Sequence, residues 1–65
     1  MISIIDQYDQ SGVLVLRGLS TDAKPIGFMP VGEALINLEN GSEFEEIDTG
    51  KVYYYDEQSH RWCLV

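Results

Sequence analysis

The chain has 65 residues, of which 11 are acidic and four are basic, so its formal net charge is −7. Such a charge excludes the usual route to nucleic acids and anionic membranes, in which cationic side chains neutralise phosphate groups. A hydrophobic fraction of 45% excludes a disordered chain. We therefore expect a single small folded domain over residues 1–65, whose natural partner surface is basic.

The chain has few of the features that usually stabilise small domains. A domain of this length buries only about 60% of the surface that its unfolded chain exposes. Disulfides, a structural metal or association with other chains usually compensate for this. Cys63 is the single cysteine and His60 the single histidine, so neither an internal disulfide nor a zinc site is expected. Association with other chains is the remaining route.

The N-terminal segment lacks the layout of a secretory signal. The apolar run Met1–Ile5 has no basic flank and stops at Asp6. No stretch approaches the roughly 18 to 20 apolar residues that a membrane span requires. We expect a soluble protein that is made inside the cell.

The first half predicts two strands. Residues 2–8 and 13–19 are rich in Ile, Val and Leu, and the polar residues 9–12 between them have the composition of a hairpin loop. Residues 13–16 are apolar at both odd and even positions, so the second strand needs cover on both faces. An N-terminal hairpin over residues 1–19 is expected.

Residues 20–40 are predicted to form a connecting loop. Pro25, Gly27 and Pro30 interrupt any long element there. Within this loop, residues 33–38 fit either a short strand or one short helical turn, because their apolar positions match both periods.

Residues 41–65 predict a three-stranded antiparallel meander over 42–65. The expected fold is therefore a small all-β domain, with two hairpin-like sheets joined by a Gly/Pro-rich loop. The triplet 48–50, Asp-Thr-Gly, fits a three-residue hairpin loop in which Gly50 takes the position that needs positive φ. Asp48 is expected to form hydrogen bonds within the turn.

This turn fixes a strand register. Phe44 then lies opposite Tyr54, and a second loop at residues 57–59 places Tyr54 opposite Trp62. One face of the meander is predicted to form the core, with Phe44, Val52, Tyr54, Trp62 and Leu64.

The opposite face of the predicted meander is half apolar. A sheet with one solvated face alternates cleanly between apolar and polar residues, so this face needs either the N-terminal hairpin or another chain to cover it. We predict that a neighbouring subunit supplies part of the cover. The predicted interface residues are Tyr53, Tyr55 and Val65, with Ile2 and Ile4 near the chain start.

The triplet 48–50 also matches the active-site motif of aspartic proteases. Such enzymes need two carboxylates that share a proton, and this chain has one triplet, followed directly by Lys51. We therefore interpret it as a turn and predict that the chain is not an enzyme and has no catalytic residues.

Other chemistry is equally sparse. His60 and Cys63 lie three residues apart without a second ligand pair, no phosphate-binding loop is present, and no alternating calcium loop occurs. The tyrosines at 53–55 have acidic neighbours, whereas nucleic-acid platforms pair aromatic side chains with basic grooves. No metal, cofactor or nucleic acid is expected to bind.

Residues 33–48 contain six carboxylates and no Lys or Arg. Such a run is either a solvated face or a docking surface for a basic partner.

Two segments carry a family resemblance: "RGLSTDAKP" at 17–25 and "GSEFEEIDTGKVYYYDEQSHRW" at 41–62. They resemble short proteins encoded among the virion-morphogenesis genes of tailed bacteriophages of Gram-positive hosts. Those proteins carry Gly-Leu-Ser-x-Asp-x-Lys-Pro, then Gly-Ser-x-Phe-x-Glu-x-Asp-Thr-Gly-Lys-x-Tyr, and a near-terminal Trp. Residues 26–40 depart from the pattern, because they form a longer and more apolar connector than the family's short linker.

The resemblance implies a non-enzymatic virion structural protein, such as a capsid-decorating or head-fibre subunit. It would be made in the host cytoplasm and would assemble with copies of itself or with a capsid or tail protein. A homo-oligomer is expected, with no membrane partner. The alternative is an acidic phage-encoded inhibitor that occupies a basic site on a host protein.

Overall fold

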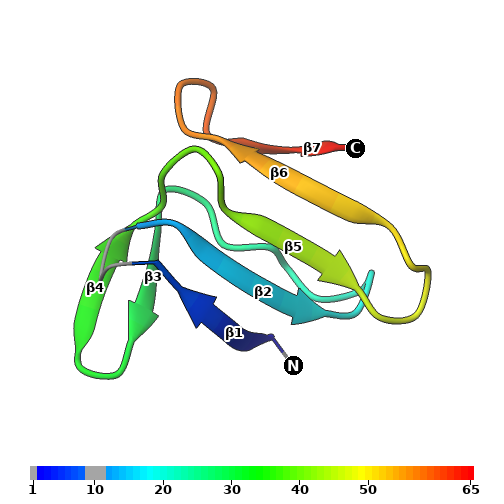
Figure 1. Cartoon of the computed structure of the whole chain (residues 1–65), viewed down its shortest axis with the longest axis horizontal. Coiled ribbons are helices and arrows are strands. Elements are labelled where there is room, and N and C mark those ends of the chain that lie inside the picture. Colours follow the sequence, from blue (N-terminus) through cyan, green and yellow to red (C-terminus); the bar gives the residue numbers. More distant parts are fainter. Residues whose placement is uncertain (1, 9–11) are drawn as a thin grey trace.

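The computed structural model describes residues 2–8 and 12–65 and confirms a small all-β fold (Figure 1). No helix occurs among these residues. A five-stranded sheet has the order β1-β2-β5-β6-β7, and a separate two-stranded sheet pairs β3 with β4. The strands are β1 (Ser3–Gln7), β2 (Leu14–Gly18), β3 (Phe28–Val31), β4 (Ala34–Asn37), β5 (Glu43–Glu46), β6 (Val52–Asp56) and β7 (Arg61–Leu64).

The N-terminal hairpin and the C-terminal meander form one sheet. Strands β2 and β5 pair in parallel, from Val15 opposite Glu43 to Gly18 opposite Glu46. The expected pair of separate sheets, with the hairpin free to lie over the meander, is therefore wrong. Parallel neighbours need a long crossover connection, and residues 19–42 provide it across one face of the sheet.

The segment 20–40 contains a hairpin, which the sequence interpretation missed. Strands β3 and β4 pair from Phe28 opposite Asn37 to Val31 opposite Ala34, joined by a tight turn in which Gly32 has φ 61°. Two-residue hairpin turns favour glycine because they need positive φ. Of the two alternatives for residues 33–38, the structure has the strand.

The core lies between the five-stranded sheet and the crossover, on the face turned away from the viewer in Figure 1. We call this side the covered face and the other side the open face. Trp62 packs against Phe44 and Tyr55, with ring centroids 6.0 Å and 5.0 Å apart. Its indole Nε1 donates to the carbonyl of Pro25 at 2.8 Å. The buried apolar residues are Leu14, Leu16, Leu38, Phe44 and Tyr55, and Ile2, Met29, Val31, Tyr53 and Trp62 pack against them.

The meander has a different register from the one expected. The Glu46 N–H donates to the carbonyl of Lys51 at 2.8 Å, so the loop comprises the four residues 47–50 instead of three. Phe44 consequently lies opposite Tyr53. The second turn is displaced as well, and Tyr53 lies opposite Leu64. A shift of one residue moves every side chain of a strand to the other face.

The predicted faces of β6 are therefore exchanged. Tyr55, an expected interface residue, is 3% exposed in the core, and Tyr53 packs against that core. Tyr54, an expected core residue, is 47% exposed. Val52 lies on the open face with it, because it pairs with Glu45. Leu64 is also not core, with 57% exposure, because it sits on the last strand of the sheet, where the cover ends.

Candidate protein interaction surface

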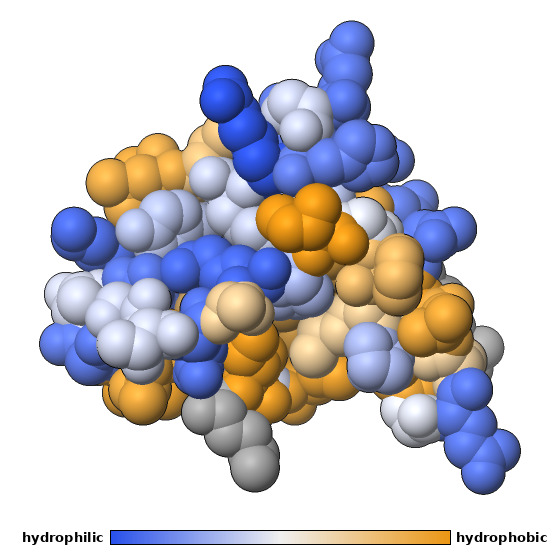
Figure 2. All heavy atoms as spheres, turned by 180° about the vertical axis from the view of Figure 1, so that it is seen from behind, coloured by the Kyte–Doolittle hydropathy of each residue, from blue (hydrophilic) through white to orange (hydrophobic). Residues whose placement is uncertain are grey.

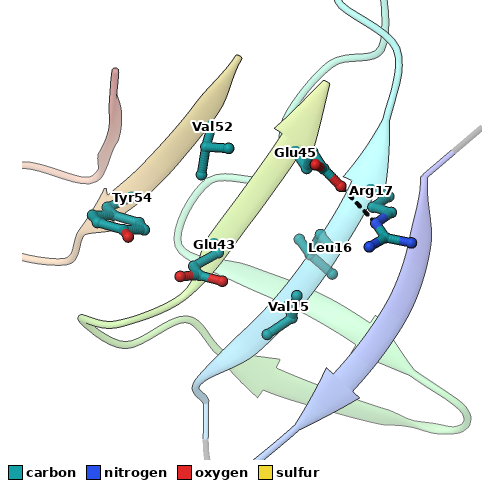
Figure 3. Close-up of a pocket in the computed structure, with 7 residues that line it drawn as sticks. All are labelled: Val15, Leu16, Arg17, Glu43, Glu45, Val52 and Tyr54. Atoms are coloured by element: carbon teal, nitrogen blue, oxygen red, sulfur yellow. Dashed lines mark hydrogen bonds and ion pairs between the residues drawn. The ribbon is translucent and has the colours of Figure 1, made fainter. Parts of the chain in front are cut away.

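The open face of the sheet presents apolar side chains between charged ones. Val15 of β2 and the pair Val52 and Tyr54 of β6 lie in its centre, with Glu43 and Glu45 of β5 between them (Figure 3). The crossover packs on the opposite face, through Met29, Val31 and Leu38. Among the described residues, these covering segments leave the open face to solvent.

The centre of the open face forms a shallow depression of about 330 Å³. All residues that line it belong to β2, β5 and β6, so it has a floor and no opposite wall. A small-molecule site encloses most of its ligand's surface, which this geometry does not allow. The depression suits a side chain that projects from another protein.

One ion pair crosses the open face. The Arg17 Nε lies 2.7 Å from Glu45 Oε1, and both side chains are about half exposed (51% and 44%). Such an exposed pair stabilises a fold by only about 0 to 1 kcal/mol. Its charged groups remain available to fix the orientation of an incoming surface.

Val65 belongs to the same face. Its N–H donates to the carbonyl of Val52 at 2.9 Å, which places the two residues side by side. Val65 is 72% exposed. The other expected interface residues lie elsewhere: Ile2 packs against the core, Ile4 is 38% exposed beside Leu16, and Tyr53 and Tyr55 lie on the covered face. The structure therefore does not bring the predicted interface set together.

The hairpin β3–β4 carries a second exposed apolar group. Pro30 lies opposite Leu35, and Leu35 and Phe28 are 68% and 55% exposed. Figure 2 shows apolar side chains gathered on the side of the molecule that carries this hairpin. This group was not predicted, because residues 20–40 were expected to form a connecting loop.

Four of the six carboxylates in residues 33–48 bind other parts of the chain. Glu39 accepts from the Gly12 N–H, and Glu45 pairs with Arg17. Glu46 accepts from the Lys24 ammonium, and Asp48 accepts from the Ser20 hydroxyl. The acidic run thus serves largely to hold the chain together.

Glu46 forms an ion pair with Lys24 at the edge of the core. Glu46 Oε2 lies 2.7 Å from Lys24 Nζ, and the Thr49 hydroxyl donates to Oε1 at 2.7 Å. The Lys24 ammonium, followed by the Thr49 hydroxyl, holds the pKa of Glu46 below its usual value. The ammonium also lies 4.7 Å and 4.5 Å from the ring centroids of Phe44 and Tyr53. Through this ion pair and the two cation–π contacts, Lys24 holds the crossover against the rings of Phe44 and Tyr53.

Asp48 joins two loops. It accepts hydrogen bonds from the Ser20 hydroxyl at 2.6 Å and from the Ser20 N–H at 3.0 Å, and not only within its own turn as expected. The Ser20 hydroxyl is the main cause of a lowered pKa at Asp48. The pKa of Asp22 is lowered as well, chiefly by the Leu19 N–H. Gly50 has φ 75°, the conformation expected for it.

The remaining candidate chemistry is not assembled in the described chain. The His60 Nδ1 lies 3.3 Å from the Tyr55 hydroxyl, while Cys63 is exposed on β7. Residues 2–8 and 12–65 contain no group of three or more side chains that could hold a metal ion. Within the same ranges, no helix is long and apolar enough to cross a membrane.

Comparison with protein-family models, with curated proteins and with solved structures gives no match to this chain.

Proposed function

We propose that this chain is a non-enzymatic structural protein of a bacteriophage virion, a capsid-decorating or head-fibre subunit that works by assembly. The resemblance of residues 17–25 and 41–62 to phage morphogenesis proteins supports the virion part of this proposal. The open face supports the assembly part. Copies of the chain, or a larger virion protein, would cover this face.

The observation that carries the proposal is the 47% exposure of Tyr54 on the open face of the five-stranded sheet. Single exposed apolar residues are normal on protein surfaces, whereas contiguous ones mark interaction sites. Tyr54 has Val52 two residues away on the same strand face, and Val65 beside Val52. Aromatic side chains of this kind are the usual anchors of protein interfaces.

The alternative, an acidic inhibitor of a basic host site, has less support. An inhibitor of that kind needs free carboxylates on one surface, and three of the six in residues 33–48, Glu39, Glu46 and Asp48, are held by other groups of the chain. Salt separates the two functions. Binding to a basic site weakens steeply as salt rises, whereas assembly through apolar faces of a chain with charge −7 strengthens or stays constant.

The test is sedimentation equilibrium of the wild-type chain and of Tyr54→Ser over a range of concentrations. Covering the exposed part of Tyr54, roughly 100 Å², is worth on the order of 2 kcal/mol, which corresponds to about thirtyfold in a dissociation constant. Ile26→Ser is the matched control, because Ile26 is 52% exposed in the crossover, which packs on the opposite face. A similar weakening by both variants would overturn the role of the open face.

The virion part has its own test. Phage particles purified on a density gradient should contain the chain in a fixed ratio to the major capsid protein, as measured by mass spectrometry. Particles of a phage that encodes this chain, purified without any trace of it, would contradict the assignment.

A further inference from the structure

Strand β7 is an edge of the sheet with few of the features that protect edges. Its residues are Arg61–Leu64, with a charge only at the first position. Exposed edges carry unpaired backbone groups, and natural proteins protect them with charged residues, prolines or bulges. Within β7, Cys63 is exposed and Leu64 is 57% exposed, and Val65, which follows the strand, is 72% exposed.

The free backbone groups of β7 can be identified from the ladder. Val65 donates its N–H to Val52 on β6, and successive residues of an antiparallel strand alternate in direction. Arg61 and Cys63 therefore face β6 with Val65. The N–H and C=O groups of Trp62 and Leu64 point outward, so the edge offers two donors and two acceptors.

We propose that β7 pairs antiparallel with β7 of a second copy, about a twofold axis at Cys63. This inference rests on the proposed assembly function and adds a second contact, at the edge of the sheet. With Cys63 opposite its own copy, Trp62 lies opposite Leu64 of the second copy, and all outward groups form hydrogen bonds. A register shifted by two residues would need His60 in an extended strand, but its φ of 54° ends the strand there. The Cys63-centred register is therefore the best paired one.

A second copy fits this edge better than other strands of the same molecule do. Strand β1, the other edge, has a bulge between Ile4 and Asp6 and carries the Asp6 charge, and both features discourage pairing. In the β7 pair, Arg61 lies opposite Val65 of the second copy, so no like charges face each other. The result is a closed symmetric dimer.

The pairing also covers side chains that the monomer leaves exposed. Leu64 lies on the covered side with Trp62, because it pairs with Tyr53, and in the dimer it would contact Trp62 of the second copy. A twofold axis perpendicular to the sheet keeps both open faces on the same side. The Tyr54 surfaces of two copies thus join into one extended sheet face.

The test is a disulfide trap at Cys63. Residues opposite each other at a non-hydrogen-bonded antiparallel position have Cα atoms about 4.5 Å apart, within the disulfide range. Copper phenanthroline takes two electrons from two thiols, which lose two protons as the S–S bond forms. The wild-type chain should form a covalent dimer at least about tenfold faster than Cys63→Ser/Ala23→Cys, whose thiol is on an exposed loop residue.

Leu64→Pro is a second test, with Leu64→Ala as its control. Proline removes an outward donor that the monomer does not use, and alanine removes only the side chain. Two lost hydrogen bonds per dimer should weaken dimerisation by about thirtyfold more for proline than for alanine. Circular dichroism checks that both variants fold. If Leu64→Pro does not fold, the disulfide trap by itself tests the β7 pairing.

The outcomes separate this inference from the function on which it rests. If the chain associates but Cys63 cross-links no faster than the loop control, or both Leu64 variants dimerise equally, the β7 contact is wrong and assembly through another surface stands. If the wild-type chain stays monomeric, the β7 pairing and self-assembly both fail, and the proposed function then depends on cover of the open face by a larger virion protein, which the analysis of purified particles tests.

Discussion

The two faces of β6 can be distinguished by comparing the stability cost of removing the hydroxyl group from Tyr55 and from Tyr54. The Gly27 N–H donates to the Tyr55 hydroxyl at 2.9 Å, and Tyr55 is 3% exposed. In Tyr55→Phe, this partly buried donor loses its acceptor, which should cost about 1 to 3 kcal/mol. Tyr54→Phe changes a side chain that is 47% exposed on the open face, so it should change the free energy of unfolding by less than about 0.5 kcal/mol.

These costs are large against the total stability, which is roughly 3 to 10 kcal/mol for a domain of this length. Urea unfolding followed by the fluorescence of Trp62, the single tryptophan, measures them. With an m-value of about 1 kcal/mol/M, the midpoint for Tyr55→Phe should fall by about 1 to 3 M. Dilute samples keep association from adding stability. Equal shifts for the two variants, or a larger shift for Tyr54→Phe, would refute the observed register.

Three further predictions concern the end of β5 and the loop that follows it. Lys24 lowers the pKa of Glu46 in the folded chain, so the unfolded chain binds more protons just below the usual value of 4.5. The stability that this ion pair contributes is therefore present above pH 4.5 and is lost as the pH falls through the folded-state pKa. Glu46→Gln should therefore reduce the fall in the urea midpoint between about pH 5 and pH 3, and an unchanged slope would contradict the ion pair. In Gly50→Ala, the added Cβ would contact no atom within 4 Å, but the residue would have to keep φ 75°. The backbone strain should lower the free energy of unfolding by about 1 kcal/mol, and an unaltered urea midpoint would argue against that conformation. Asp48→Asn weakens the bonds from Ser20 and should lower the urea midpoint, and a midpoint at or above the wild-type value would show that the loop contact is not needed.

Local patterns in the sequence were sufficient to locate most strands. Alternating and continuous apolar runs predict the positions of β1, β2, β6 and β7, and Gly50 marks the turn between β5 and β6. These features depend on a few neighbouring residues, so they can be predicted from a single sequence.

The faces of the meander could not be predicted with the same information. Gly50 adopts positive φ, as a three-residue loop requires, but the observed loop has four residues. That difference of one residue exchanges the environments of Tyr54 and Tyr55. The order of apolar residues did not decide between the two registers, because β6 is apolar or aromatic on both faces from Val52 to Tyr55.

The long-range features were also beyond local reasoning. The parallel pairing of β2 with β5 joins residues 28 positions apart, such as Leu16 and Phe44, and no nearby pattern encodes it. The hairpin β3–β4 was not predicted, because its glycine and proline residues were interpreted as signals of a loop. Pro30 and Gly32 favour a loop when counted as breakers, yet in the structure Gly32 makes the turn and Pro30 lies within β3.

The central claim is that the chain exposes a sheet face and a sheet edge which other copies cover. Sedimentation equilibrium of the wild-type chain over about a hundredfold range of concentration, at low and at high salt, tests it most directly. We predict a mass that rises with concentration from one copy to at least two, with association equal or stronger at high salt. A single-copy mass at every concentration and at both salt levels would contradict the account.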